Sequence, residues 1–379
     1  RHSRASGAIP QIALIMGPVA GGQAYSPALM DFIFMVKDTS YMFIAGPPLV
    51  KAVVFEETTV EELGSPEVHC QISGVADLYR QNDKECLDTT KELLSYIPQN
   101  CSEEPPFVET DDPPNRIEED LLKIIPTDPN AAYDMHDVIY KIVDDEKILE
   151  IKGEFAPNVI CCFARMNGRT VGIVASNPMV MAGCLDYKAS QKACRFIRFC
   201  DCYNVPLVNL QDVPAFLIGT RSERSGIIRH GSKMLYAYSE ATVPKITLVL
   251  RKAYAGGYLA MCSKDLGADF VFELPTAEIC LMGPAGAVNI LFRKEMKEAK
   301  EKGEDPEKVR RKRLDEFYDK YVNPLYSAGL QHVDDIIDPR TMRPAIINAL
   351  EICRTKRDEL PRKKHGNMPI SLGGAFSGN

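Results

Sequence analysis

Two stretches of the chain, "IPQIALIMGPVAGGQAYSPAL" (residues 9–29) and "VPKITLVLRKAYAGGYLAM" (residues 243–261), follow one pattern. Each runs from a proline through an apolar segment typical of a strand to Ala-Gly-Gly, which a tyrosine follows closely. The continuations also match, because each predicts a helix and two short strands before a Gly-Pro pair, at 46–47 and at 283–284. A block of this length occurring twice indicates a duplicated supersecondary unit.

The residues before the second copy predict a mostly parallel sheet covered by helices. The hairpin "ARMNGRTVGIVAS", with its Asn167-Gly168 turn, precedes a helical segment, "SQKACRFIRFCDCYN", and a short strand, "VPLVNLQDV". Such alternation is typical of βαβ units and therefore of an α/β fold. The first copy has almost no such residues upstream, so we expect a first domain that is incomplete at its N-terminus.

A proline- and acid-rich segment, residues 98–116, has no apolar period and is the best candidate for a linker between domains. It leads us to predict a partial first domain over residues 1–108 and a second domain over residues 109–370.

Composition excludes several classes of function. The net charge is −7, which argues against electrostatic attraction to nucleic acid or to an anionic membrane surface. No apolar run approaches the ~20 residues that cross a bilayer, so we expect no membrane-spanning helix. The charged run at 293–320 mixes both signs, which favours solvated helices with ion pairs over a basic arm. The 12 cysteines include no C-x-x-C pair, and they predict reduced thiols in a reducing compartment and no metal site.

The two glycine pairs, Gly21–Gly22 and Gly256–Gly257, are candidate catalytic residues. Glycine has no Cβ, so a ligand oxygen can approach its N–H closely, and the N–H groups at the start of a helix have no intrahelical acceptor. Two such groups aimed at one point form an oxyanion hole. A single pair is more simply explained by close helix–strand packing, but two equivalent pairs favour the oxyanion holes. His230, which has no carboxylate partner in sequence, is more simply explained as a structural residue.

Long segments resemble the carboxyltransferase (beta) subunits of biotin-dependent acyl-CoA carboxylases. They include "GPVAGGQAYSPALMDFIFMVKDTSYMFIAGP", "FARMNGRTVGIVA", "SGIIRHGSKMLYAYSEATVPKITLVLRKAY", "PTAEICLMG" and the closing "KKHGNMP". The propionyl-CoA carboxylase beta chain and the methylmalonyl-CoA carboxyltransferase and decarboxylase subunits look most similar.

The resemblance implies a fold, a reaction and a set of site residues. It implies two crotonase-like ββα-superhelix domains, in which Gly21 and Gly22 hold the thioester oxygen and Gly256 and Gly257 polarise the biotin ureido oxygen. It also implies that the biotin anion removes the α-proton, which fits the absence of an evident base. Other residues that we expect at the substrates are Ala20, Tyr25, Tyr254, Tyr258, Leu259, Ala215, Phe216 and Gly226.

The same resemblance implies partners and a location. Acyl-CoA and carboxybiotin meet between two subunits, so we expect a homo-oligomer, a hexamer with a dimer as the catalytic unit. Biotin must arrive on a separate biotin carboxyl carrier or biotin carboxylase subunit, because the chain has no Ala-Met-Lys-Met motif. The compartment implied is the bacterial cytoplasm or the mitochondrial matrix, and the acyl-CoA implied is propionyl-CoA or methylmalonyl-CoA.

Departures from the family pattern leave alternatives open. Ala215 and Ile218 replace Gly and Pro, and Ser225 replaces the first of two glycines. An alanine at a position that needs positive φ would cost about 1 kcal/mol or more and shift the loop beside biotin. These changes keep open a non-catalytic scaffold subunit that assembles with an active paralogue. A crotonase-type hydratase would need glutamates beside the acyl site, and the sequence identifies none.

Overall fold

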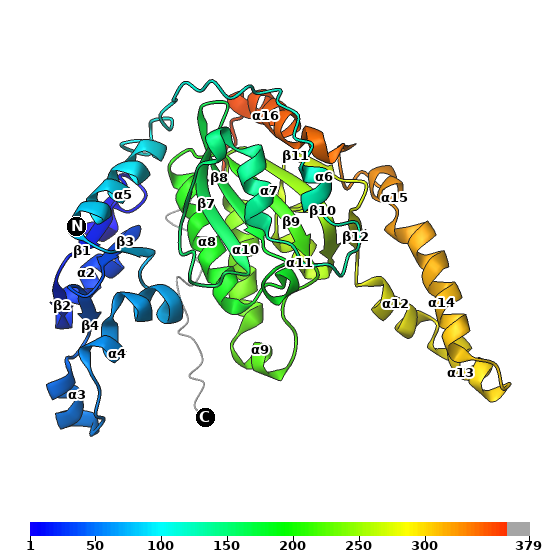
Figure 1. Cartoon of the computed structure of the whole chain (residues 1–379), viewed down its shortest axis with the longest axis horizontal. Helices are drawn as coiled ribbons and strands as arrows, with labels where there is room; N and C mark the ends of the chain where they lie inside the picture. Colours follow the sequence, from blue (N-terminus) through cyan, green and yellow to red (C-terminus); the bar gives the residue numbers. More distant parts are fainter. Residues whose placement is uncertain (362–379) are drawn as a thin grey trace.

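The computed structural model describes residues 1–361, and its largest element is an eight-stranded sheet with the order β13-β11-β10-β9-β8-β7-β6, on which β12 pairs with β10 (Figure 1). Strands β8, β9, β10, β11 and β13 run parallel, whereas β6, β7 and β8 are antiparallel neighbours. The bounds are β6 Ile148–Glu150, β7 Val159–Met166, β8 Arg169–Ser176, β9 Leu207–Val213, β10 Lys245–Tyr254, β11 Phe270–Glu273, β12 Glu278–Cys280 and β13 Asp335–Ile336.

Helices cover both faces of this sheet. One hydrophobic cluster joins one face to α8 and α10, and the other cluster joins the opposite face to α6, α7 and α16. Adjacent strand residues alternate between the clusters, so that Cys161 contributes to the first and Cys162 to the second. This accounts for the continuous apolar runs of the sequence. The bounds are α6 Leu121–Ile124, α7 Met135–Ile142, α8 Tyr187–Cys202, α9 Thr220–Arg224, α10 Ile227–Glu240 and α16 Met342–Ile352.

The N-terminal part forms a separate three-stranded sheet, β1-β3-β5, and a two-stranded sheet, β2-β4. Its strands are β1 Ile12–Ile15, β2 Pro18–Ala20, β3 Phe32–Val36, β4 Tyr41–Phe43 and β5 Leu78–Arg80. Its helices are α1 His2–Ala5, α2 Tyr25–Ala28, α3 Pro47–Val54, α4 Val60–Gly64 and α5 Asp83–Tyr96.

Residues 97–120 contain no helix or strand, as expected of the linker. The core nevertheless continues across it, because the rings of Phe32 and Phe199 are 4.6 Å apart and the buried Lys152 pairs with Asp77 at 3.0 Å. The domain boundary at residue 108 stays a prediction.

The strand register confirms the internal duplication. β1 pairs in parallel with β3, and β2 with β4; in the second copy the first half of β10 pairs with β11, and its last residues pair with β12. β10 thus corresponds to β1 and β2 joined, with an irregularity between Val249 and Ala253 where the break would fall. α3 and α12 (Pro284–Leu291) both begin directly after the Gly of a Gly-Pro pair.

The Asn-Gly turn and the charged run form as the sequence predicts. The 167–168 turn closes the antiparallel β7–β8 hairpin with positive φ at both residues, as its Asn-Gly pair predicts. The charged run forms α13 (Arg293–Glu301) and α14 (Pro306–Phe317), which are linked by an Arg313–Glu295 ion pair of 2.8 Å, and α15 (Pro324–Gly329) follows. All 12 cysteines are free. No helix within residues 1–361 has the length and apolarity to cross a bilayer. The "KKHGNMP" segment lies outside the described residues.

Candidate functional site

The first glycine turn leaves β2 and opens a short 3₁₀ helix, Gly21–Ala24, that continues into α2. Gly21 has a φ of +64°, a conformation that glycine adopts without strain. No side chain caps the helix, so the structure assigns no side-chain acceptor to its first N–H groups. Gly22 is exposed, and a Cβ built on it would meet no heavy atom within 4 Å. Tyr25, which is 57% exposed, follows the turn. The turn is therefore an open stretch of backbone that a ligand can approach.

The second turn leaves β10 and opens α11 (Ala255–Ala260), again with no side-chain cap. Its first residue, Ala255, has a φ of +50°, which is strained for a residue with a Cβ. Gly257 is buried, and a Cβ there would lie 2.9 Å from Val213 and 3.3 Å from the Cα of Ala215. Gly256 is half-buried, and its Cβ would lie 3.4 Å from the Phe216 ring. Packing against the loop after β9 thus requires glycine at 257, whereas the backbone at 256 remains accessible.

The strand ends change how the two turns correspond. β2 ends at Ala20 and β10 ends at Tyr254, so Gly21 corresponds to Ala255 and Gly22 to Gly256. Matching the letters Ala-Gly-Gly shifts this correspondence by one residue. The positive φ of both Gly21 and Ala255 supports the correspondence taken from the strands.

The loop after β9 closes one side of the second turn. The N–H of Leu185 donates to the carbonyl of Ala215 at 3.0 Å, and the Phe216 ring packs against both Gly231 and Gly256. Positive φ occurs in this loop at Gly219 and Gly226. The expectation of strain at Ala215 is not met, because its φ is not positive, and the same holds for Ile218 and Ser225. These substitutions leave the backbone of the loop unstrained.

His230 is buried beside Gly226, and its Nδ1 has no hydrogen-bond partner within residues 1–361. Burial, together with the nearby charge of Lys233, lowers the pKa of His230, so the ring is neutral near pH 7. Among residues 1–361, no carboxylate bonds to its Nδ1.

Two buried contacts beside the second turn were missed by the sequence reasoning. Arg251 Nε donates to Asp212 Oδ2 at 2.7 Å, and both side chains are almost fully buried. Asp212 Oδ1 also accepts from the N–H of Lys252 at 3.2 Å, so the carboxylate joins the end of β9 to β10 just before the turn. The signal was the pair Arg251 and Lys252 inside an otherwise apolar strand.

The second missed contact involves Tyr254, whose hydroxyl donates to the carboxylate of Glu278 on β12. Burial raises the pKa of Glu278, and the hydrogen bond from Tyr254 opposes this shift. The Tyr254 hydroxyl therefore points into the fold, and its ring packs against Gly283. Tyr258 is also buried, and of the expected substrate contacts on α11 only Leu259 has substantial exposure, at 38%.

The expected site residues divide into two groups. Ala20, Gly21, Gly22 and Tyr25 surround the first turn, whereas the second group surrounds the second turn and comprises Ala215, Phe216, Gly226, Tyr254, Gly256, Gly257, Tyr258 and Leu259. Figure 1 shows α2 at one side of the molecule and α11 near its centre, so the two turns do not meet within one chain. Among residues 1–361, no cluster of three or more His, Cys, Asp or Glu side chains could hold a metal ion.

A family model and the most similar sequences both relate this chain to carboxyltransferases. A model described as "Carboxyl transferase domain" matches residues 1–368. The alpha subunit of methylmalonyl-CoA decarboxylase from Propionigenium modestum is 51% identical over 370 residues, which are 98% of this chain and 71% of the relative. The methylmalonyl-CoA carboxyltransferase 12S subunit of Propionibacterium freudenreichii subsp. shermanii is 52% identical over 366 residues, which are 96% of this chain and 68% of that subunit.

The solved structures agree. The crystal structure of transcarboxylase 12S, described as a hexamer assembly with methylmalonyl-coenzyme A and methylmalonic acid bound, superposes with a TM-score of 0.93 at 51% identity and covers 97% of this chain and 70% of that chain. The expected crotonase-like α/β fold is confirmed by this likeness.

Proposed function

The chain belongs to the carboxyl transferase domain family, and we propose that it moves a carboxyl group between carboxybiotin and propionyl-CoA or methylmalonyl-CoA. The names of its relatives support this choice of substrate, because they include methylmalonyl-CoA decarboxylase, methylmalonyl-CoA carboxyltransferase and propionyl-CoA carboxylase subunits. The observation that carries the proposal is the pair of uncapped glycine turns, which occupy corresponding places in a duplicated fold.

In this proposal the first turn binds the acyl-CoA thioester. The N–H groups of the open turn at Gly22 donate to the thioester oxygen, and they stabilise the negative charge that this oxygen gains when the α-carbon becomes nucleophilic. Tyr25 is exposed beside them and covers part of the acyl group. The role proposed for the turn is to orient the thioester and to stabilise charge, and the biotin anion removes the α-proton.

The second turn holds the ureido oxygen of biotin; carboxybiotin would supply the carboxyl group there, and the biotin anion that remains would supply the base. Fit to biotin rests on the half-buried Gly256 at an uncapped helix start, next to the apolar Phe216 and the partly exposed Leu259. Ala255 retains its N–H, so its side chain removes no donor. The ion pair of Asp212 and Arg251 fixes the strand ends that carry this turn.

The complete reaction site requires two copies of the chain. Since the turns lie apart in one chain (Figure 1), the first turn of one copy would meet the second turn of another. Apolar side chains exposed on the corresponding segments around α3 and α12 suit such an interface; they are Leu49, Val53, Val54, Phe55, Leu281, Ile290 and Leu291. The hexamer in the description of the transcarboxylase 12S structure supports a hexamer, and the dimer that pairs the two turns would be its catalytic unit.

In this proposal biotin arrives on a separate biotin carboxyl carrier or biotin carboxylase subunit; the given residues contain no Ala-Met-Lys-Met motif. The free cysteines favour a reducing compartment, the bacterial cytoplasm or the mitochondrial matrix.

Transfer of labelled carboxyl from methylmalonyl-CoA to free biotin tests the proposal. We expect label on biotin that depends on the assembled oligomer and is lost when bulky side chains replace both Gly22 and Gly256. An assembled chain that binds an active paralogue but neither acyl-CoA nor biotin would refute the proposal and favour the scaffold alternative.

A further inference from the structure

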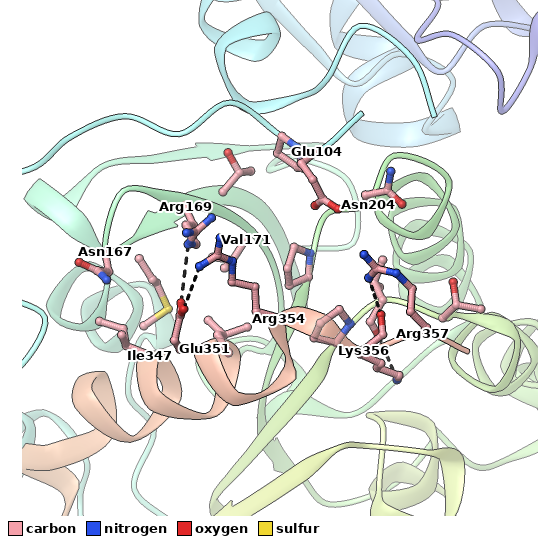
Figure 2. A pocket seen from close by; sticks show the side chains of 18 of the residues that line it. Glu104, Asn167, Arg169, Val171, Asn204, Ile347, Glu351, Arg354, Lys356 and Arg357 are labelled. Carbon is pink, nitrogen blue, oxygen red and sulfur yellow. Dashed lines mark hydrogen bonds and ion pairs between the residues drawn. The ribbon is translucent and has the colours of Figure 1, made fainter. Parts of the chain in front are cut away.

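A cavity of about 400 Å³ opens at the end of the sheet opposite the second glycine turn (Figure 2). It is lined by the start of β8 and by Pro206 and Pro244, which directly precede β9 and β10. The turn lies at the other end of β10, which spans 10 residues, or about 30 Å at the rise of a strand. The cavity is therefore separate from the proposed reaction site, and its volume is that of a small-molecule site.

The inner wall of the cavity is apolar. Val171, Val243 and Ile347 are buried there, and Leu350 of α16 adds a partly exposed wall. The linker passes over the opening of the cavity. Asn204 holds the linker there, because its side-chain amide donates to the carbonyls of Cys101 at 3.0 Å and Glu103 at 2.9 Å. A ligand in the cavity would contact the linker and α16 together.

Charged side chains of both signs line the cavity; the cationic ones are Arg169, Arg354, Lys356 and Arg357, and the acidic ones are Glu104, Glu351 and Asp358. The carboxylate of Glu351 forms ion pairs with Arg354 at 3.1 Å and with Arg169 at 3.8 Å, which are dashed lines in Figure 2. Lys356 pairs with Asp269 at 3.0 Å and with Asp358 at 3.3 Å. Arg357 also lines the cavity, but within residues 1–361 its guanidinium reaches only the carbonyl of Lys356, at 2.7 Å, and no carboxylate.

Thr170 adds a buried donor to the lining. Its side chain is 2% exposed, and its Oγ1 has no hydrogen-bond partner within residues 1–361. A buried hydroxyl without a hydrogen-bond partner destabilises the fold, so a ligand oxygen that accepts from Thr170 would offset this cost.

We propose that this cavity binds a small organic carboxylate with an apolar body. The body lies on Val243 and Ile347, and the carboxylate accepts from Arg357 and Thr170. Glu104, on the linker at the edge of the cavity in Figure 2, also lacks an ion-pair partner within residues 1–361. An apolar amino acid would place its ammonium group there, whereas a simple organic acid would not use it.

Calorimetric titration of the whole chain with three probes tests this site. The probes are 3-phenylpropionate, its neutral amide and phenylalanine. We expect at least one of the two acids to bind about tenfold or more tightly than the amide. We expect Arg357→Gln to reduce the affinity of that acid about tenfold, because it removes a hydrogen bond between two charged groups. If phenylalanine binds more tightly than 3-phenylpropionate and Glu104→Gln removes the difference, the ligand class is an amino acid; otherwise it is a simple acid.

Thr170→Val provides a second measurement, because valine has the shape of threonine without its hydroxyl. We expect it to weaken binding of the acid while leaving the thermal stability of the free protein equal or higher. Equal binding of the acids and the amide, or full affinity in both Arg357→Gln and Thr170→Val, would overturn the proposal. Crystals grown with 4-bromobenzoate give the position directly, and a bromine peak away from Val243 and Ile347 would also overturn it.

Discussion

Substitution of Gly22 by alanine separates a catalytic role of the first turn from a packing role. The φ of Gly22 is not positive, and a Cβ there meets no heavy atom within 4 Å, so alanine fits without strain. The residue lies in a short helix, where alanine is favoured over glycine by about 0.5–1 kcal/mol. We therefore expect Gly22→Ala to fold with unchanged or slightly higher stability.

The rate of carboxyl transfer, in contrast, should fall in Gly22→Ala. The added methyl group stands where the thioester oxygen approaches the backbone, and a displacement of about 1 Å at a reacting centre costs about 10²-fold in rate. Transfer of labelled carboxyl from methylmalonyl-CoA to biotin should therefore fall about 10²-fold, with the melting temperature unchanged. Gly17→Ala is the matched control, because its Cβ also meets nothing within 4 Å and it lies before β2, at the opposite end from the turn. Wild-type activity in Gly22→Ala would refute the assignment of the first turn.

Three further predictions concern buried or partly buried charges. Arg251→Met leaves Asp212 charged and unpaired in the core, so urea unfolding should show a loss of about 3–5 kcal/mol; a loss below 1 kcal/mol would contradict the importance of this pair. Glu150 first, and Asp134 as well, raise the pKa of His136 to about 9, so its stabilisation of about 2–3 kcal/mol is complete below pH 6.5 and disappears as the pH rises through 9. His136→Gln should therefore differ from wild type in unfolding free energy at pH 6 but not at pH 10, and a constant difference would exclude the linkage. Burial raises the pKa of Glu273 to about 7, so folding favours its protonated form and wild-type stability falls between pH 4.5 and 7. Glu273→Gln should be more stable than wild type by about 3 kcal/mol above pH 7 and equal to it below pH 4.5, and equal stability at pH 8 would show that burial does not affect this carboxyl group.

The local features of the fold could be predicted from the sequence. The Asn-Gly hairpin, the linker and the duplicated block depend on turn chemistry and periodicity, which short segments contain. The correspondence of the two turns was shifted by one residue because identical letters were matched, whereas the strand ends decide that Gly21 corresponds to Ala255. The spacing of apolar residues in the sequence does not show where each strand ends, and therefore does not show this correspondence.

Side-chain contacts between neighbouring strands could not be predicted from turn chemistry and periodicity. Asp212 and Arg251 are 39 residues apart and meet only because β9 and β10 are parallel neighbours. Tyr254 was expected to contact substrate, yet its hydroxyl bonds to Glu278 because β12 pairs with the end of β10. In the proposed function the two glycine turns meet only between two copies of the chain, and the sequence of one copy does not show how two copies pack.

The most direct test of the proposed function is a crystal structure of the assembled protein with methylmalonyl-CoA and biotin. The account predicts that the thioester oxygen lies within hydrogen-bond distance of the backbone at Gly21 and Gly22 of one copy, and the ureido oxygen within the same distance of Gly256 or Gly257 of another. Binding of either group away from both turns, or of both groups to one copy, would contradict it.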